Sequence, residues 1–271
     1  MVSEFGSMVA GNWSPIILGH RGARGLAPEN TIEGFQCAAG MGLRAAELDV
    51  HLTRDGHLVV IHDHSVDRTT DGSGRIETFS LEEIQNLDAA SEWEGRYGRC
   101  LIPTLEQVLE NFGDRFDWEI EIKIDDMTVD AKETVAIVAQ TIREFGLERR
   151  ATIMSFSDLA IKFAQTNAPD ISRGFITSSD PLAAVGVATE VGCSRIGLHQ
   201  SLLSPEVVRA VRLTDMALHG WQGNSDDEMR RLSKARVDGF SSDRPDIAIH
   251  WMRQNGFEPD LVGEVESNHD I

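Results

Sequence analysis

Cysteines and long apolar runs are scarce in this sequence, and their scarcity narrows the class of protein. The 271 residues include three cysteines, Cys37, Cys100 and Cys193, which are odd in number and far apart. This spacing argues against a disulfide framework and against a cysteine-based zinc site, so we expect three reduced thiols that pack in the core. No run of eighteen apolar residues is present, which excludes a transmembrane helix.

A secretory leader and an excess of basic residues are missing as well. The N-terminus lacks the charged-then-apolar pattern of a secretory signal, and we therefore expect a soluble, cytoplasmic protein. Lysine and arginine number 25 against 44 aspartates and glutamates, which gives a formal net charge of −19. Because nucleic acids and anionic membranes attract basic patches, we expect no nucleic-acid partner and no stable membrane association. An anionic small substrate would need a cation close by.

The chain is long and apolar enough to bury a large core. With 271 residues, 41% of them hydrophobic, it suits either one α/β barrel or two small domains. We expect a single domain at residues 9–258. Residues 1–8 resemble a cloning remnant before a second initiator methionine, and residues 259–271 form an acidic tail that is poor in apolar residues.

Strand-like and helix-like segments alternate along this domain. Strands are predicted at residues 15–19, 44–52, 118–124, 151–155, 172–176, 195–198, 216–221 and 237–241. Helices are predicted at residues 32–41, 105–112, 129–145, 158–165, 181–187, 205–213, 226–233 and 245–255. An insertion at about residues 63–103, with one short helix at 81–87, separates the second strand from its helix. Eight consecutive βα units predict a closed parallel (β/α)8 TIM barrel, in which sites lie at the C-terminal ends of the strands.

The stretch from Glu47 to Asp63 contains an electrostatic problem. Because side chains alternate along a strand, Glu47 and Asp49 share one face of an otherwise apolar segment. Two carboxylates on a buried face repel each other and are costly to desolvate unless a cation lies between them. The chain then turns at residues 55–56 and returns through four apolar residues to His62. This stretch therefore requires a metal ion or a basic partner.

The third predicted strand repeats the pattern by placing Glu119, Glu121 and Lys123 on one face. Glu47, Asp49 and Glu121 together offer hard oxygen ligands, which suit one Mg²⁺, Ca²⁺ or Mn²⁺ ion better than zinc. The alternative is a structural network in which the carboxylates pair with arginine and lysine. The position of all three carboxylates on neighbouring strands favours the metal site.

Two histidines and two basic residues accompany the carboxylates. His20 follows the first strand, and together with His62 it can supply a general base and a general acid. Arg21 and Lys123 add positive charge that can hold phosphate oxygens and stabilise a pentacoordinate transition state. Trp221, at the end of the seventh strand, can form an apolar wall at the mouth. The alternatives are packing roles for the histidines and the tryptophan, and ion pairs with nearby acids for the basic residues.

An ordered set of motifs extends over nearly all of the globular chain. These motifs are His20-Arg21-Gly22, Pro28-Glu29-Asn30-Thr31, Glu47-x-Asp49, Thr53-x-Asp55-Gly56, His62-Asp63, Arg68-x-Thr70, Pro103-Thr104-Leu105, Glu121-x-Lys123, Ser155-Phe156, Trp221 and Asp243-x-Pro245. Together they resemble the glycerophosphodiester phosphodiesterase family. Each motif alone is weak, whereas the ordered set is highly specific.

The resemblance implies a (β/α)8 barrel with a small insertion after the second strand, and cleavage of a glycerophosphodiester to glycerol 3-phosphate and an alcohol. The implied roles are acid–base catalysis for His20 and His62, metal binding for Glu47, Asp49 and Glu121, phosphate binding in catalysis for Arg21 and Lys123, and a wall for the glycerol for Trp221.

The sequence departs from the family pattern at three positions. Glu119 stands where the family usually has a neutral residue, often asparagine, and it would lie one pleat, roughly 7 Å, below Glu121. It is either an interior ion or a competitor for the role of third metal ligand. Gln222 and Ser242 replace the more usual threonine. These two changes affect the rim of the substrate site and leave the proposed catalytic set intact.

Three functions follow from these observations. The first is a metal-dependent phosphodiesterase that uses both histidines, with attack by the neighbouring glycerol hydroxyl or by water. A related alternative is a phospholipase D-like enzyme acting on lysophospholipid or sphingomyelin, which would need an apolar mouth. The third is a catalytically silent barrel that binds glycerophosphodiesters. Such a binder has no need of a two-sided acid–base pair, which favours an enzyme.

Overall fold

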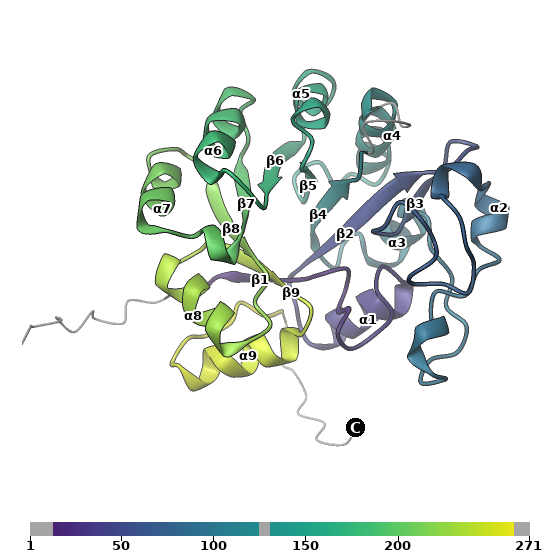
Figure 1. Cartoon of the computed structure of the whole chain (residues 1–271), viewed down its shortest axis with the longest axis horizontal. Coiled ribbons are helices and arrows are strands. Elements are labelled where there is room, and N and C mark those ends of the chain that lie inside the picture. Colours follow the sequence, from purple (N-terminus) through teal and green to yellow (C-terminus); the bar gives the residue numbers. More distant parts are fainter. Residues whose placement is uncertain (1–12, 125–130, 263–271) are drawn as a thin grey trace, which may run out of the picture.

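The computed structural model describes residues 13–124 and 131–262, and within them eight parallel strands form a closed barrel (Figure 1). The barrel strands are β1 (Ile16–Gly19), β2 (Ala45–Leu52), β4 (Asp117–Ile122), β5 (Ala151–Ser155), β6 (Ser172–Thr177), β7 (Arg195–His199), β8 (Ala217–Trp221) and β9 (Gly239–Ser242). Because β1 pairs with both β2 and β9, the ring closes. The predicted (β/α)8 barrel is confirmed.

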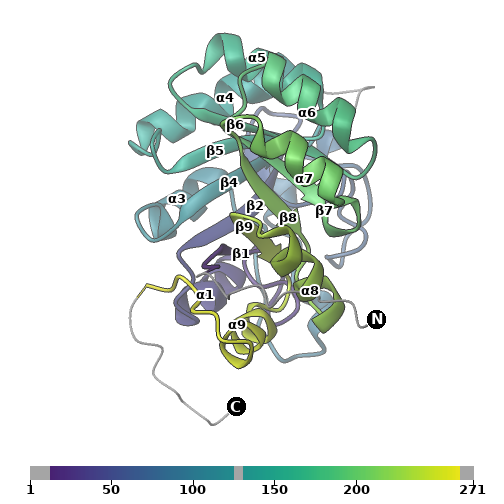
Figure 2. The ribbon, with the colours of Figure 1, turned by 90° about the vertical axis from the view of Figure 1, so that its left-hand side faces the viewer.

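Helices cover the outer face of the sheet, as the side view in Figure 2 shows. They are α1 (Ile32–Gly40), α3 (Leu105–Phe112), α4 (Ala131–Glu144), α5 (Asp158–Asn167), α6 (Pro181–Glu190), α7 (Pro205–Arg212), α8 (Asp226–Ala235) and α9 (Pro245–Gln254). Local sequence explains where several of them begin. The hydroxyls of Thr31, Thr104 and Ser225 accept hydrogen bonds from first-turn amides. Proline occupies the first turn of α6, α7 and α9, where its missing N–H costs nothing.

Apolar residues on the outward face of the strands pack against these helices. Leu48, Ile120 and Ile153 are completely buried in this layer. Trp118 extends it at the start of β4 and contacts Phe35 edge to face, with 5.4 Å between the ring centroids. Since the hydrophobic core lies outside the strands, the inward-facing positions can carry charged side chains. This arrangement positions the site inside the barrel mouth.

The insertion after β2 builds a small core of its own. Strand β3 (Leu58–Val60) runs antiparallel to β2 after a turn in which Gly56 has a φ of 83°. Two 3-10 turns, η1 (Ile76–Thr78) and η2 (Ser91–Trp93), and helix α2 (Leu81–Ile84) follow. Their buried residues are Val59, Ile61, Val66, Ile76, Ile84, Ala89, Ala90, Cys100 and Ile102. The predicted insertion is therefore present, and it packs against the barrel rim.

Several predicted boundaries differ from the structure. The short helix of the insertion ends at Ile84 rather than Leu87, and β4 ends at Ile122 rather than Ile124. In both cases backbone hydrogen bonds continue past the end of the regular element, from Leu87 N to Ile84 O and from Lys123 N to Val50 O, so the sequence pattern overestimates its length. The expected remnant at residues 1–8, the start of the helix predicted from Val129, and residues 263–271 of the predicted tail lie outside the described residues. The proposed limits of the domain stay a prediction.

Two expectations from composition concern the cysteines and membrane-spanning helices. Cys37, Cys100 and Cys193 are free thiols, and the last two are buried. Over residues 13–124 and 131–262, no helix combines the length and the apolarity needed to cross a membrane.

Candidate active site

The predicted site residues meet in one cavity at the C-terminal ends of the barrel strands. This cavity has a volume of about 160 Å³. Its charged or ionisable lining residues are His20, Arg21, Glu47, His62, Glu119, Glu121, Lys123 and His219. Asp49 lies just behind this lining and is completely buried. The structure thus brings together every candidate site residue that the sequence singled out.

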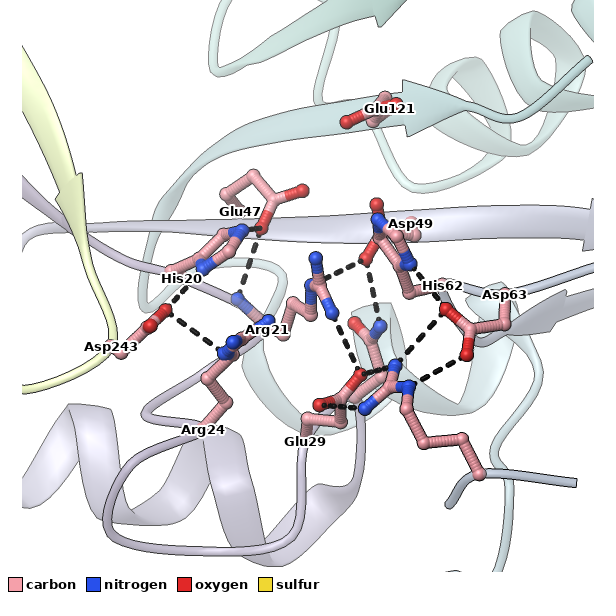
Figure 3. Close-up of polar contacts among 12 residues, drawn as sticks. His20, Arg21, Arg24, Glu29, Glu47, Asp49, His62, Asp63, Glu121 and Asp243 are labelled. Atoms are coloured by element: carbon pink, nitrogen blue, oxygen red, sulfur yellow. Dashed lines mark hydrogen bonds and ion pairs between the residues drawn. The ribbon is translucent and has the colours of Figure 1, made fainter. Parts of the chain in front are cut away.

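Glu47, Asp49 and Glu121 form the acidic centre of the cavity (Figure 3). One oxygen from each carboxylate lies within 4.8 Å of the others, and all three residues are buried. The register of β2 and β4 explains this proximity, because Asp49 is directly opposite Glu121. Three converging carboxylate oxygens are the donor set that hard divalent cations prefer.

The electrostatics of these carboxylates fit a cation. Burial raises the pKa of Glu47 well above its usual value, and repulsion from Asp49 and Glu121 raises it further. Burial likewise raises the pKa of Glu121 to about 7, with Lys123 opposing the shift. Asp49 is the exception, because Lys123 and Arg21 outweigh the effect of burial and hold its pKa far below the usual range. A divalent cation among the three oxygens would relieve the repulsion that Glu47 and Glu121 experience.

Lys123 and Arg21 provide part of the compensating positive charge. Lys123 Nζ lies 3.0 Å from Asp49 Oδ1 and also contacts Glu121. Arg21 Nε lies 3.3 Å from Asp49 Oδ2. Three carboxylates therefore face two cations, so the centre has a net negative charge when all three carboxylates are ionised. A divalent cation would reverse that sign and make the centre attractive to a phosphate.

The turn after β1 positions Arg21 at this centre. Arg21 adopts a left-handed conformation, with a φ of 52°, and its backbone N–H donates a 3.0 Å hydrogen bond to Glu47 Oε2. Gly22 follows with a φ of 84°, and a Cβ there would lie 2.5 Å from the backbone carbon of Gly34 in α1. Only glycine satisfies both conditions, which explains the His-Arg-Gly sequence in physical terms.

His20 is oriented by an aspartate from the far end of the chain. Its Nδ1 donates to Asp243 Oδ1, and its Nε2 lies 3.8 Å from Glu47 Oε2 at the acidic centre. Asp243 is held in turn by Arg24, at 3.1 Å, and by the amide of Asn224, at 2.9 Å. Burial lowers the pKa of His20, and Asp243 opposes that shift.

His62 has a separate carboxylate partner. Its Nδ1 lies 2.7 Å from Asp63 Oδ1, and Asp63 accepts a 2.6 Å hydrogen bond from Arg68 Nε. Burial lowers the pKa of His62, while the charge of Asp49 opposes the shift. The side chain of His62 is 32% exposed, compared with 11% for His20. His62 therefore lies nearer to solvent than His20.

Arg68 connects the insertion to the barrel. It donates to Glu29 at 2.8 and 3.0 Å in addition to its bond with Asp63. Glu29 also accepts a 2.9 Å hydrogen bond from Arg21 Nη1. Arg68 thus holds both Asp63, which contacts His62, and Glu29, which contacts Arg21.

Sequence reasoning missed several of these supporting residues. Arg24 and Asn224 were not singled out, and Asn30, whose Nδ2 donates to Asp49 Oδ2 at 2.9 Å, was named only within a motif. Arg68 was noted only as part of a motif. Conversely, Ser155, which the sequence named in the Ser155-Phe156 motif, is buried and donates its hydroxyl to the backbone oxygen of Ile122. No local pattern signals such contacts, because their partners are distant in sequence.

Glu119 lies apart from the metal-binding candidates. It pairs with Arg195 Nη1 at 2.8 Å and with His219 Nδ1 at 2.7 Å, and it is not one of the three converging carboxylates. Although burial raises its pKa, His219 and Arg195 outweigh that effect and lower the pKa to about 2. Of the two roles left open by the sequence, this geometry favours an interior ion over a metal ligand.

Trp221 forms part of an apolar wall on one side of the cavity. Its ring meets Phe156 edge to face, with 5.9 Å between centroids, and it also contacts His199 at 4.9 Å. Met154 and Ile176 continue this wall deeper into the cavity. The cavity therefore has an ionic side on β1, β2 and β4 and an apolar side on β5, β6 and β8, which suits an amphipathic ligand.

Comparison with known families identifies this arrangement. The profile of the glycerophosphoryl diester phosphodiesterase family matches residues 20–247, from the first catalytic candidate to the start of α9. The chain belongs to this family. The resemblance predicted from the motifs is therefore confirmed, and the protein is a phosphodiesterase of the glycerophosphoryl diester class.

Individual members of the family support this assignment. A glycerophosphodiester phosphodiesterase of Caldanaerobacter subterraneus is 35% identical over 242 residues, which cover 89% of this chain and 99% of the relative. A solved phosphodiesterase of Oleispira antarctica, in complex with sn-glycerol-3-phosphate, is 28% identical with a TM-score of 0.82, covering 89% of this chain and 98% of the other. A Silicibacter pomeroyi structure, at 24% identity and a TM-score of 0.80 over 90% of this chain and 95% of its own, shares the fold.

The different surroundings of Glu121 and Glu119 predict unequal effects of removing their charge. Glu121→Gln removes one of three converging oxygens, and we expect kcat to fall by at least about a hundredfold because metal binding is worth several kcal/mol in such sites. Glu119→Gln should lower kcat by roughly tenfold or less, since Glu119 is not one of the three converging carboxylates. Steady-state kinetics at saturating Mg²⁺ measures both. A larger loss for Glu119→Gln would show that the third ligand has been misassigned.

Proposed function

We propose that this protein is a metal-dependent phosphodiesterase that hydrolyses glycerophosphodiesters to glycerol 3-phosphate and an alcohol. The observation that carries the proposal is the presence of two imidazoles, each oriented by its own carboxylate, beside one acidic centre. A protein that only binds its ligand needs one such group at most. Two oriented proton carriers suit a displacement at phosphorus, where one oxygen attacks and another leaves.

The metal site of this proposal consists of Glu47, Asp49 and Glu121. Their hard oxygen donors favour Mg²⁺ or Ca²⁺, with Mn²⁺ as a further candidate. When bound, the ion would neutralise a phosphate oxygen and stabilise the charge that develops on it. Arg21 and Lys123 adjoin the same centre, so they are placed to hold the remaining phosphate oxygens.

The two histidines divide the proton transfers in this mechanism. One imidazole removes a proton from the attacking oxygen, and the other donates a proton to the departing alcohol. Asp63 and Asp243 act as positioning residues, because a carboxylate at Nδ1 fixes the tautomer that leaves Nε2 free to exchange a proton. The attacking oxygen is either the neighbouring glycerol hydroxyl, which yields a cyclic phosphate, or water. Early detection of cyclic glycerol phosphate would support the first route.

The direct test is the release of glycerol 3-phosphate from glycerophosphocholine and glycerophosphoethanolamine with Mg²⁺, Mn²⁺ or Ca²⁺ added. We expect turnover on at least one of these substrates, at a kcat within the usual range of about 1–10³ s⁻¹. A complete lack of turnover on every head group and metal would favour the silent barrel. The cytoplasmic location and the lack of a nucleic-acid partner remain predictions of the sequence.

One observation favours testing lysophospholipids in the same assay. Phe156 and Leu159, which follow β5 beside the cavity, are 43% and 48% exposed, and Leu182 is 43% exposed at the start of the neighbouring α6. Such exposed apolar residues near the mouth could contact an acyl chain. Faster turnover of lysophosphatidylcholine than of glycerophosphocholine would identify the phospholipase D-like alternative.

A further inference from the structure

Glu119, Arg195 and His219 form a second polar cluster at the floor of the cavity. Glu119 is opposite Glu47 in the register of β2 and β4, and it lies two residues before Glu121 on the same face of β4. Two residues along a strand correspond to roughly 7 Å. Glu119 therefore lies one pleat below Asp49 and Glu121 and level with Glu47, at the lower edge of the acidic centre, and the proposed mechanism makes no use of it.

Interior glycines create the space that this cluster occupies. A Cβ on Gly239 would lie 2.8 Å from the ring of His219, and a Cβ on Gly174 would lie 2.7 Å from Cγ of Arg195. His219 and Arg195 therefore pack directly against the backbone of Gly239 and Gly174. Bulky apolar residues usually fill the interior of such barrels, so the glycines open a polar floor where a packed layer is the norm.

Only one oxygen of Glu119 is used within this cluster. Oε1 receives both the 2.8 Å hydrogen bond from Arg195 and the 2.7 Å contact from His219. Among the described residues none donates a hydrogen bond to Oε2, and this atom is not one of the fully buried side-chain oxygens that lack a partner. Because Glu119 lines the cavity, Oε2 is accessible there to a ligand that donates a hydrogen bond.

We infer that this floor is a hydroxyl-binding subsite, in which Glu119 Oε2 accepts a hydrogen bond from the terminal hydroxyl of the glycerol half of the substrate. The charge of Glu119 is already balanced by Arg195, so a neutral hydroxyl is a better partner than a further cation. Met154 and Ile176 line the cavity beside it and suit the carbon chain. The inference rests on the proposed function and makes Glu119 a residue that determines specificity for the glycerol half.

The depth of the cluster supports this orientation of the substrate. A phosphate held by Arg21 and Lys123 at the level of Asp49 and Glu121 leaves one strand pleat, roughly 7 Å, to Glu119. A three-carbon chain attached through an ester oxygen can span this distance, given bonds of about 1.5 Å. The alcohol half of the substrate would then point to the open mouth, near the more exposed His62. The glycerol half, which all glycerophosphodiesters share, would thus bind at the closed floor. The alcohol half, which differs among them, would lie at the open mouth.

The test compares two substrates that differ in one hydroxyl. Glycerophosphocholine carries the terminal hydroxyl, whereas 2-hydroxypropyl phosphocholine lacks it but keeps the neighbouring hydroxyl that can attack phosphorus. We expect wild-type kcat/KM to favour glycerophosphocholine by roughly tenfold to a hundredfold, because the analogue leaves a buried charged acceptor unpaired. In Glu119→Gln, kcat/KM should fall by about tenfold for glycerophosphocholine and by less than about twofold for the analogue.

Asp117→Asn is the matched control for this variant. Asp117 lies on the same strand and, like Glu119, pairs with two basic side chains, in this case Arg44 and Arg150, but it does not line the cavity. Asp117→Asn should leave the ratio of kcat/KM for glycerophosphocholine to kcat/KM for the analogue unchanged. If Glu119→Gln reduces turnover of both substrates equally, or if the wild type does not distinguish them, Glu119 has only a structural role and the inference is wrong.

A binding measurement separates this inference from the proposed function. Calorimetry with glycerol 3-phosphate and with 2-hydroxypropyl phosphate requires no turnover. Glu119→Gln should weaken the binding of glycerol 3-phosphate by about tenfold and leave the binding of the deoxy compound within about twofold. If Glu119→Gln weakens only the binding of glycerol 3-phosphate and the wild type has no diesterase activity, the subsite is supported and the proposed function is contradicted. If the wild type and Glu119→Gln bind glycerol 3-phosphate with equal affinity, the subsite is wrong even if the wild type is an active diesterase.

Discussion

We expect His20→Ala and His62→Ala each to reduce kcat by at least about a thousandfold. Each substitution removes one of two proton transfers, and such a transfer accelerates a reaction by about 10²–10⁴-fold. The folded structure should survive both changes, because neither imidazole belongs to the apolar core. Initial rates with glycerophosphocholine, together with thermal unfolding curves, measure the two effects separately. A loss of this size in both variants would establish that both proton carriers are needed.

The control for these variants is His57→Ala. His57 lies in the exposed turn before β3, outside the cavity, so its removal should leave kcat unchanged. Retention of more than about a tenth of wild-type activity in either active-site variant would contradict the acid–base pair. Loss in only one of them would indicate that water supplies or removes the other proton.

The pH profile provides a second measure of the same pair. Burial lowers the pKa of both His20 and His62 from the ordinary value of 6.5. The imidazole that acts as the base must be neutral, and a lowered pKa keeps it neutral at lower pH. We therefore expect the acid limb of kcat/KM to lie below pH 6.5. An acid limb above that value would contradict the predicted effect of burial.

Exhaustive chelation should abolish turnover, and Mg²⁺, Ca²⁺ or Mn²⁺ should restore it. The expected loss is at least about a hundredfold, because the ion supplies several kcal/mol of charge stabilisation in sites of this kind. Chelation leaves three buried carboxylates facing two cations, so at a pH where all three are ionised the phosphate would meet a centre of net negative charge. Activity that persists after complete chelation would rule out the carboxylate–metal proposal.

Metal binding should also depend on pH in a defined direction. The folded-state pKa of Glu121 is about 7, above its ordinary value of 4.5. Between these two values the metal-free native state binds more protons than the unfolded chain, so its stability falls as pH rises from 4.5 to about 7. A divalent cation replaces the protons on Glu47 and Glu121, and its stabilising effect must grow over the same range.

Two measurements check this linkage. The increase in Tm on adding Mg²⁺ should be larger at pH 8 than at pH 5, and calorimetry in buffers of different ionisation enthalpy should detect proton release near pH 6. Glu121→Gln is the control, since it removes one of the two titrating ligands and should diminish the proton release. A shift in Tm that is independent of pH would show that these carboxylates do not bind the ion.

Much of the architecture follows from patterns within short segments. Alternation along β2 and β4 places Glu47, Asp49 and Glu121 on inward faces, and side-chain period alone requires this. Eight successive strand and helix patterns at this length are typical of a closed parallel barrel, and the pairing of β1 with both β2 and β9 confirms it. The carboxyl ends of parallel strands lie at the same rim of the barrel, so these three side chains lie close together there. The predicted short helix and the end of β4 were too long, since the side-chain pattern does not reveal where the regular helical or strand geometry ends.

The amino-acid sequence by itself determined the barrel, the insertion and the inward direction of the charged side chains. Only the tertiary structure decided which partner each of them has. His20 pairs with Asp243 across 223 residues, Arg68 with Glu29 across 39, and Glu119 with Arg195 across 76. The physical reason is that periodicity fixes the face on which a side chain lies, whereas its partner depends on the position of strands on the other side of the ring. Glu119 shows the consequence, because its neighbours along β4 resemble metal ligands while its neighbours in space are basic.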